Sequence, residues 1–270
     1  WRTMSMADIV VGHAESLLAA LFAAAGVDES HGLTHAKAVL RHAECALAAA
    51  VEPPGPSISL AVRLAALLHD ADDKKYFLCS AKTYANARRI MEEATMDVYD
   101  EGVINLAVRM ISLVSCSANG NNIPADAQSQ PEILWPRWAD RLEATGLIGV
   151  VRCWQYNKMK GDPLYLQSTP RATSEAELWQ LATEERFASY QERDGSSASM
   201  MDHFYDKLLQ VSRPPAEVVR NSYLEREATE RAAPIVDFCL EYGKTGTVSE
   251  DELSNWAKTF CSSEAGMTYS

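Results

Sequence analysis

Apolar residues recur along this chain at the spacing of an amphipathic helix, and strict alternation of apolar and polar residues is rare. The pattern predicts helices over about 5–26, 34–51, 58–70, 80–95, 98–115, 132–153, 173–190, 200–211, 215–242 and 249–261. The stretch 58–70 is apolar on most sides, which is typical of a helix at the centre of a core. Because no strand pattern longer than a few residues occurs, the sequence predicts an all-α fold.

Residues that break helices mark the expected turns. The run Glu52-Pro53-Pro54-Gly55-Pro56 cannot continue a helix and predicts a turn. Residues 117–130 have the composition of an exposed loop, and residues 157–172 are expected to be irregular. Gly146 is expected to bend or interrupt the helix predicted over 132–153.

Composition narrows the classes of molecule that the protein is expected to bind. The chain has 270 residues and a formal net charge of −12, so it lacks the general basic charge that attracts DNA or RNA. It contains no run of about 20 uninterrupted apolar residues and no basic segment leading into an apolar signal segment. Its six cysteines share no CxxC spacing, and we expect free thiols in a reducing compartment. We therefore expect a cytoplasmic protein that binds neither a membrane nor a nucleic-acid polymer.

Histidine is scarce and unevenly distributed. Four of the six histidines lie between positions 31 and 69, and His31, His35 and His42 are spaced to share one helix face. The apolar helix expected over 58–70 ends in an adjacent His69-Asp70 pair. A buried ionised carboxylate is costly unless a cation compensates it, and a divalent metal ion is such a cation. For the pair alone, a helix-capping histidine beside a solvated aspartate is the plainer interpretation.

Three stretches of the sequence and a weaker fourth strengthen the interpretation as a metal site. The chain contains His31-Gly32-Leu33-Thr34-His35, then Ala65-Ala66-Leu67-Leu68-His69-Asp70, then Ala139-Asp140-Arg141-Leu142-Glu143-Ala144-Thr145-Gly146, and, as a weaker match, His203-Phe204-Tyr205-Asp206-Lys207-Leu208-Leu209. In this combination the chain resembles the HD superfamily of metal-dependent phosphohydrolases over about residues 12–240. The likeness is greatest to the YpgQ/YedJ-type branch of that superfamily.

The resemblance implies an HD-domain helical bundle with a C-terminal helical extension. We expect a single all-α domain over 1–270, with a metal-site core over about 12–155 and a C-terminal helical part over about 173–262. The resemblance implies that His35, His69, Asp70 and Asp140 bind one divalent metal ion. Mn²⁺ is the first choice, with Mg²⁺, Fe²⁺, Co²⁺ or Ni²⁺ as alternatives, because a mixed nitrogen and oxygen ligand set fits these ions better than structural zinc.

Such a site would activate a water molecule for attack on a phosphorus atom. Asp73, one turn beyond His69, would orient or deprotonate this water, and Lys75 would bind a phosphate. Alternatively, the charged run at 72–75 is only a solvated surface. His31 would contact the phosphate or support the metal ion, or is simply a polar residue at the start of a helix.

His203 and Lys207 would contribute to a nucleotide pocket, or would serve only the packing of their own helix. The resemblance implies hydrolysis of nucleoside or deoxynucleoside triphosphates to the monophosphate and pyrophosphate, with a small-molecule nucleotide as substrate. A 5′-nucleotidase or phosphodiesterase on the same site stays open, as does a non-catalytic module that binds a nucleotide. The sequence does not determine the base, the sugar or the oligomeric state.

Two other motifs are discounted. Gly243-Lys244-Thr245 looks like the end of a phosphate-binding P-loop, but the required earlier glycine would fall at Phe238 and no strand precedes it. The basic residues Lys158, Lys160 and Arg171 form no aromatic-interleaved pattern of the kind that binds single-stranded nucleic acid.

Overall fold

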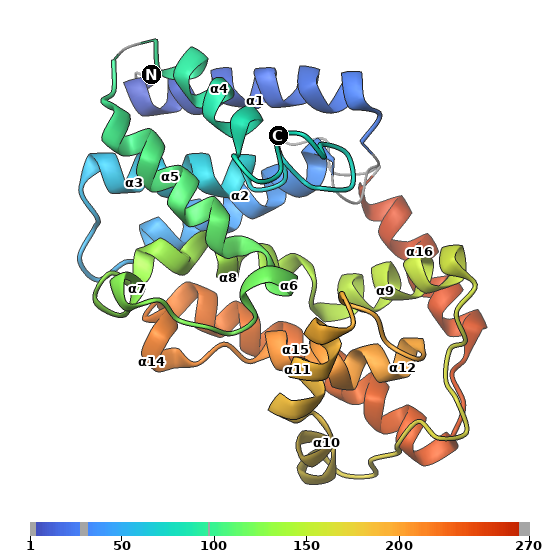
Figure 1. The fold of residues 1–270 in the computed structure, drawn as a ribbon. Coiled ribbons are helices and arrows are strands. Elements are labelled where there is room, and N and C mark those ends of the chain that lie inside the picture. The colour runs from blue at the N-terminus through green and yellow to red at the C-terminus, as the bar shows by residue number, and fades with distance from the viewer. Residues whose placement is uncertain (1–3, 28–31, 97, 265–270) are drawn as a thin grey trace. The chain divides into compact units, whose positions relative to one another are not determined.

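The computed structural model describes residues 4–27, 32–96 and 98–264. Throughout this part of the chain, helices are joined by turns and no residue lies in a strand, which confirms the predicted all-α class (Figure 1). Contacts between Cα atoms divide the chain into two compact units. Unit 1 comprises Trp1–Asp140 and Pro215–Glu225, and unit 2 comprises Arg141–Pro214 and Arg226–Ser270.

The boundary between the two units falls between Asp140 and Arg141, inside helix α8 (Trp135–Glu143). The first segment of unit 1 therefore ends at Asp140, the residue that we expect to be the last metal ligand. The expectation of one domain over the whole chain stays a prediction.

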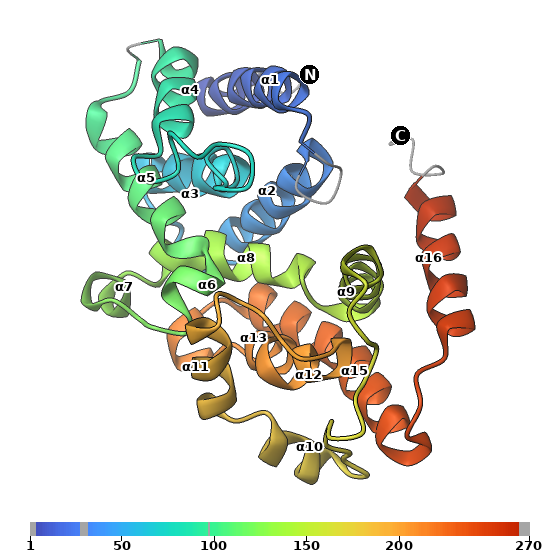
Figure 2. The ribbon, with the colours of Figure 1, turned by 45° about the vertical axis from the view of Figure 1, so that its right-hand side comes forward.

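Unit 1 is built around the helix that the sequence pattern places at its centre. Its longer helices are α1 (Met6–Ala25), α2 (Leu33–Ala48), α3 (Pro56–Leu68), α4 (Ala85–Thr95) and α5 (Glu101–Val114). Helix α3 lies between α2 and α5 and also contacts α1 (Figure 2). All its residues from Leu60 to Leu68 except Arg63 are buried, as expected for a helix that is apolar on most sides.

Local sequence signals determine where several of these helices begin and end. Ser5 and Asp8 form a reciprocal capping box at the start of α1, and Gly26 ends that helix in the left-handed conformation. Pro56 occupies the first turn of α3, where its missing N–H costs nothing. The Asp100 side chain accepts a hydrogen bond from the Val103 N–H at the start of α5.

Helix α1 is long and apolar enough to cross a membrane and lies near the N-terminus. In the structure it contacts α2, α3 and α4 and buries Val10, Val11, Ala14, Leu18 and Phe22. Only 28% of its apolar window is buried, and a core helix or a signal sequence would also have this length and composition. The cytoplasmic location stays a prediction.

The remaining elements of unit 1 are short. They are α6 (Cys116–Asn119), α7 (Ala125–Ser129), the 3-10 helix η1 (Pro131–Leu134) and α14 (Ala216–Val219). The expected loop over 117–130 thus contains two short helical turns. The expected helix over 80–95 begins only at Ala85, because residues 70–84 form a series of turns instead.

Unit 2 contains a second apolar core. Its helices are α9 (Gly146–Lys160), α10 (Glu175–Leu181), α11 (Glu184–Glu192), α12 (Met200–His203), the π-helix η2 (Phe204–Leu208), α13 (Leu209–Ser212), most of α15 (Ser222–Thr245) and α16 (Glu250–Glu264). Val150, Phe204, Ile235, Cys239 and Leu253 are among the residues buried in this core. The cysteines at 45, 79, 116, 153 and 239 are free thiols, as expected.

Two glycines in this part of the chain have clear structural reasons. Gly146 separates α8 from α9 and has a φ of 75°, which confirms the expected interruption. Gly243 lies inside α15, where a Cβ atom would be 1.6 Å from the carbonyl oxygen of Ala172. Close packing against Ala172 therefore explains the glycine of the P-loop-like tripeptide. Helix α9 extends to Lys160, so the segment expected to be irregular from 157 begins only at Gly161.

Candidate metal centre

Three helices of unit 1 bring the predicted ligands together. His35 lies in the first turn of α2 and is buried. His69 is the residue that ends α3, and Asp70 follows it directly. Asp140 lies on α8, three residues before the last residue of that helix, Glu143. The central apolar helix thus places two polar side chains directly after its C-terminal end, where that of His69 is buried and that of Asp70 is partly exposed.

The side chains of these four residues converge. The Nε2 atoms of His35 and His69 are 3.2 Å apart. One carboxylate oxygen of Asp140 lies 3.3 Å from the His35 Nε2 atom and 3.4 Å from that of His69. One oxygen of Asp70 lies 3.4 Å from the His69 Nε2 atom and 3.8 Å from that of His35. Residues 105 positions apart in the sequence therefore meet at one point.

A main-chain hydrogen bond orients the imidazole of His69. Its Nδ1 atom lies 2.8 Å from the carbonyl oxygen of Ala66, which can only accept, so Nδ1 carries a proton. In the neutral ring, Nε2 is then the atom with a lone pair, and it points toward His35, Asp70 and Asp140. Metal-binding histidines are typically held in this way through their other ring nitrogen.

The electrostatics of the cluster show how strongly it attracts positive charge. Burial disfavours a charged His69, but the carboxylates of Asp70 and Asp140 outweigh this effect and raise the pKa of His69 well above its usual value. Burial also works against ionisation of Asp140, yet hydrogen bonds from His35 and His69 bring the pKa of Asp140 well below its usual value. The pKa of Asp70 is lowered as well: the charge of His69 overcomes the effect of burial.

These donors fit a divalent cation. His35, His69 and Asp140 offer one ligand atom each within 4.8 Å of one another, and the oxygen of Asp70 adds a fourth donor beside them. Two imidazole nitrogens with two carboxylates form a ligand set that suits Mn²⁺, Fe²⁺, Co²⁺ or Ni²⁺. A cation at this point would take the place of the proton that the carboxylates otherwise stabilise on His69.

Two adjacent aspartates in the loop that follows Asp70 differ in burial and in their hydrogen bonds. Asp72 is buried, and its two carboxylate oxygens accept hydrogen bonds from the backbone N–H groups of Asn86 and Ala87 at the start of α4. Asp73 is only partly buried and accepts a hydrogen bond from the N–H of Lys75, whose side chain is exposed. Asp72 therefore fixes the loop, which the sequence pattern did not indicate. The catalytic roles of Asp73 and Lys75 stay predictions.

Not all of the predicted site residues belong to this cluster. His31 lies outside the described residues. His203 and Lys207 belong to unit 2, whereas the four converging residues belong to unit 1. His42 is buried and its Nδ1 atom lies 2.7 Å from the hydroxyl of Tyr223, which connects α2 to the start of α15.

Arg137 holds the helix that carries Asp140 and was not identified from the sequence. Its side chain is buried, and its Nε atom donates to the carbonyl oxygen of Leu113 near the end of α5 at 2.7 Å. A second donor of the same guanidinium binds the carbonyl oxygen of Asn122 at 2.9 Å. A charged residue between Trp135 and Trp138 on one helix is the sequence signal that indicates such a buried arginine.

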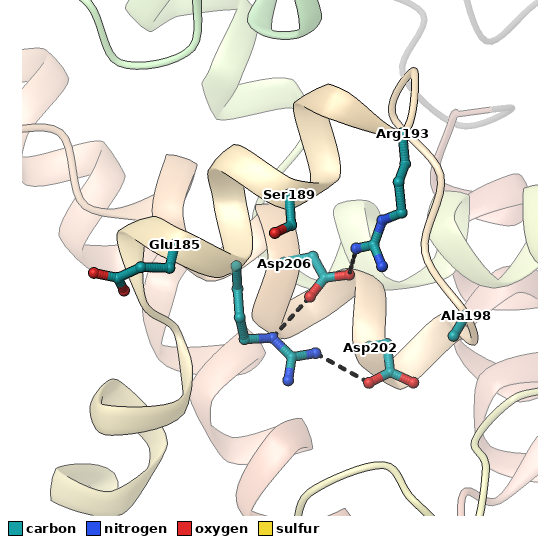
Figure 3. A pocket seen from close by; sticks show the side chains of 7 residues that line it. Glu185, Ser189, Arg193, Ala198, Asp202 and Asp206 are labelled. Carbon is teal, nitrogen blue, oxygen red and sulfur yellow. Dashed lines mark hydrogen bonds and ion pairs between the residues drawn. The ribbon is translucent and has the colours of Figure 1, made fainter.

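A second cluster of charged residues lies in unit 2 around a cavity of about 330 Å³ (Figure 3). Arg186 donates to Asp206 at 2.7 Å and to Asp202 at 3.0 Å, and Arg193 donates to Asp206 at 3.3 Å. Ser197 also donates to Asp206. The two aspartates are thus paired with two arginines, and this network joins α11 to the π-helix.

No family model matches the chain. The chain is 37% identical to the uncharacterized protein L803 of Acanthamoeba polyphaga mimivirus over 225 residues, which cover 78% of this chain and 88% of that protein.

Several solved structures share the fold. A protein of Lactobacillus plantarum matches with a TM-score of 0.57 and 20% identity over 90% of this chain and 97% of its own. A protein of Listeria innocua matches with a TM-score of 0.57 and 19% identity over 92% and 100%. An HD-superfamily hydrolase of Bacillus thuringiensis matches with a TM-score of 0.53 and 19% identity over 87% and 95%. The chain therefore has the fold of an HD-superfamily hydrolase.

Proposed function

Because the chain belongs to the same family as the mimivirus protein L803 and has the fold of an HD-superfamily hydrolase, we propose that it is a metal-dependent phosphohydrolase. The observation that carries the proposal is the convergence of His35, His69 and Asp140, with Asp70 beside them, at the end of a buried helix. A structural role alone does not explain two facing imidazole nitrogens surrounded by carboxylates.

The residues of the cluster would act together to hold the ion. A divalent metal ion bound there would make a water molecule more acidic and would neutralise charge on a phosphoryl group. His69 supplies its Nε2 lone pair because Ala66 keeps the proton on Nδ1. Asp70 and Asp140 provide the negative charge that retains the cation. We keep His31 as a candidate for contact with the phosphate.

Two residues of the following loop would serve the reaction itself. Asp73 would accept a proton from the attacking water or orient it, and its hydrogen bond from the Lys75 N–H fixes the direction of its carboxylate. The exposed ammonium group of Lys75 would contact a phosphate oxygen of the substrate. Both groups belong to the loop that Asp72 ties to α4.

For the substrate we propose a nucleoside or deoxynucleoside triphosphate, cleaved to the monophosphate and pyrophosphate. The resemblance of the chain to the YpgQ/YedJ-type branch supports this choice. A 5′-nucleotidase would instead release orthophosphate from a nucleoside monophosphate, and a phosphodiesterase would open a diester. Product analysis separates the three activities, because pyrophosphate, orthophosphate and an opened diester are chemically distinct.

The test is a screen of Mn²⁺-loaded protein against nucleotides, with wild type compared to Asp70→Ala and Asp140→Ala. We expect either substitution to abolish turnover while the far-ultraviolet circular dichroism stays helical. Asp237→Ala, which removes an exposed carboxylate from α15, is the matched control and should retain full activity. Full activity in both site variants would overturn the assignment of the site. Metal binding without turnover of any nucleotide would favour a non-catalytic nucleotide-binding module.

A further inference from the structure

A short strap, residues 215–225, belongs to unit 1 although it comes from the C-terminal half of the chain. It consists of α14, a turn at Arg220 and the first residues of α15. Arg220 has a φ of 46°, in the left-handed region that a residue with a Cβ atom rarely adopts, so α14 ends there and the chain changes direction. The residues on either side of this turn, Val219 and Asn221, are both buried.

The strap binds the helix that carries Asp140. The indole N–H of Trp135, the first residue of α8, donates to the carbonyl oxygen of Val219 at 3.1 Å. Both residues are buried, so water does not compete for this bond. Helix α14 also packs against η1, which leads directly into α8. Since each helical residue adds about 1.5 Å, Asp140 lies only about 7.5 Å along the helix from this contact.

The strap also binds the helix that carries His35. The Nδ2 group of Asn221 donates to the carbonyl oxygen of Ala46, in the last turn of α2, at 2.8 Å. The carbonyl groups of a last turn have no regular α-helical partner, so that of Ala46 can accept this bond. The Oδ1 atom of the same amide accepts from the N–H of Leu224 at 3.2 Å and caps the start of α15. One buried side chain therefore joins α2 to α15.

The two helices that the strap binds meet again at the candidate metal centre. His35 lies at the opposite end of α2 from Ala46, and its Nε2 atom is 3.3 Å from a carboxylate oxygen of Asp140. Helices α2 and α8 are therefore held together at two points, by the strap and at the metal centre. Because helices transmit displacements as rigid elements, a shift of either helix at the strap changes the separation of His35 and Asp140.

We propose that Asn221 and Trp135 are positioning residues for the metal centre, and that through the strap they hold His35 and Asp140 at the separation a divalent cation requires. The inference rests on the proposed function in so far as it assigns a metal ion to this cluster. Removing a group that directly orients a metal ligand typically costs about 10–100-fold in affinity. Asn221 and Trp135 act at a greater distance, so we expect a smaller loss, about fivefold for each.

The test measures the Mn²⁺ affinity of the full chain by isothermal titration calorimetry. Asn221→Ser keeps a capping hydroxyl for α15 but removes the amide that reaches Ala46, and Trp135→Phe keeps an aromatic ring but removes the indole N–H. Each variant should bind Mn²⁺ about fivefold more weakly. A purely structural role would lower the unfolding midpoint and leave the affinity of the folded protein unchanged. Since either change breaks the same connection, the double variant should bind hardly more weakly than either single variant.

Tyr223→Phe is the matched control on the strap. It removes a hydroxyl that lies 2.7 Å from the Nδ1 atom of His42 on α2. Tyr223 is only partly buried, so water can take the place of this hydroxyl, and the bonds of Asn221 and Val219 stay intact. Its Mn²⁺ affinity should equal that of wild type. Wild-type affinity in both Asn221→Ser and Trp135→Phe would overturn the proposal, and so would losses that multiply in the double variant.

A measurement without metal separates this inference from the proposed function. In EDTA, a double-mutant cycle with His35→Ala and Asp140→Ala gives the coupling of these two side chains in the free energy of unfolding. We expect Asn221→Ser to reduce this coupling to about half or less. If wild type binds no Mn²⁺ but the coupling still falls, the metal assignment is refuted and the positioning role stands. An unchanged coupling would refute the positioning role itself.

Discussion

The guanidinium group of Arg137 donates a hydrogen bond of 2.7 Å to the carbonyl oxygen of Leu113, and this bond ties α8 to α5. Helix α5 packs against α3, and His69 caps the C-terminal end of α3. Asp140 lies one turn beyond Arg137 on the same helix. The contact between Arg137 and Leu113 therefore connects the elements that carry ligands from distant parts of the chain.

Replacing Arg137 with methionine should affect both stability and the metal site. The substitution removes two hydrogen bonds from a buried charged group and leaves the carbonyls of Leu113 and Asn122 without this donor. We expect a loss of about 3 kcal/mol in the free energy of unfolding. Because Asp140 loses its support, affinity for Mn²⁺ should fall about tenfold or more. Denaturant titration and calorimetry measure the two effects.

Tyr223→Phe is the control for this experiment. It removes the hydroxyl that lies 2.7 Å from His42 in the same unit, and should cost about 1 kcal/mol of stability with no change in Mn²⁺ affinity. In an Asp140→Asn background, Arg137→Met should produce no further loss of Mn²⁺ affinity. An equal further loss in that background would show that Arg137 does not act through Asp140.

A bound metal ion should stabilise the folded protein by a predictable amount. At a free Mn²⁺ concentration one hundred times its Kd, the folded state gains about 2.7 kcal/mol, because the unfolded chain has no assembled site. Thermal unfolding should therefore shift upward by several degrees with Mn²⁺ and return to its original midpoint with EDTA. His35→Ala, which removes one of the facing imidazoles, should eliminate most of the shift. An unchanged shift in His35→Ala would place the ion elsewhere.

The adjacent residues Asp72 and Asp73 should respond differently to alanine. Asp72→Ala removes the acceptor for the N–H groups of Asn86 and Ala87 and should destabilise the protein by about 1–2 kcal/mol. Asp73→Ala should change stability by less than about 0.5 kcal/mol but should lower kcat while leaving Mn²⁺ affinity intact. Chemical denaturation with steady-state kinetics distinguishes them. An unchanged kcat in Asp73→Ala would show that Asp73 stabilises the turn and takes no part in the reaction.

The burial of His203 should make stability depend on pH. Its pKa is about 3 in the folded protein and close to 6.5 in the unfolded chain, so the unfolded chain binds an additional proton between these pH values. The stability that comes from a neutral His203 is fully present above about pH 6.5 and is lost as the pH falls toward 3. His203→Gln should therefore lose less stability than wild type between pH 7 and pH 4.5. Denaturant midpoints at the two pH values measure the difference, and identical losses would contradict the prediction.

Much of the fold could be predicted because helical periodicity and capping residues act locally. The helix expected over 5–26 is observed at Met6–Ala25, and the apolar pattern over 58–70 correctly indicates the central helix Pro56–Leu68. The predicted helix boundaries were wrong where tertiary contacts determine the residue at which a helix begins. The segment 80–84 forms turns because Asp72, which is distant from Ala85 in sequence, caps α4 at its observed start.

The candidate metal site could likewise be predicted only in part from the sequence. A resemblance of motifs was enough to name His35, His69, Asp70 and Asp140, and the structure brings these side chains together. The groups that hold them in place were not found, because periodicity does not reveal which carbonyl a buried guanidinium meets. The π-helical turn after His203 was also not predicted, since a single displaced hydrogen bond leaves the apolar spacing almost unchanged.

The partner that fixes the proton on His69 is a main-chain carbonyl, that of Ala66, and not a side chain. Every residue type supplies the same oxygen atom at position 66, so the polarity of the side chain there does not affect the proton on His69. Ala66 is fully buried on the central helix, and a larger side chain would overpack the core around it. The orientation of the His69 ring therefore depends on position 66 through the size of the side chain and not through its chemistry.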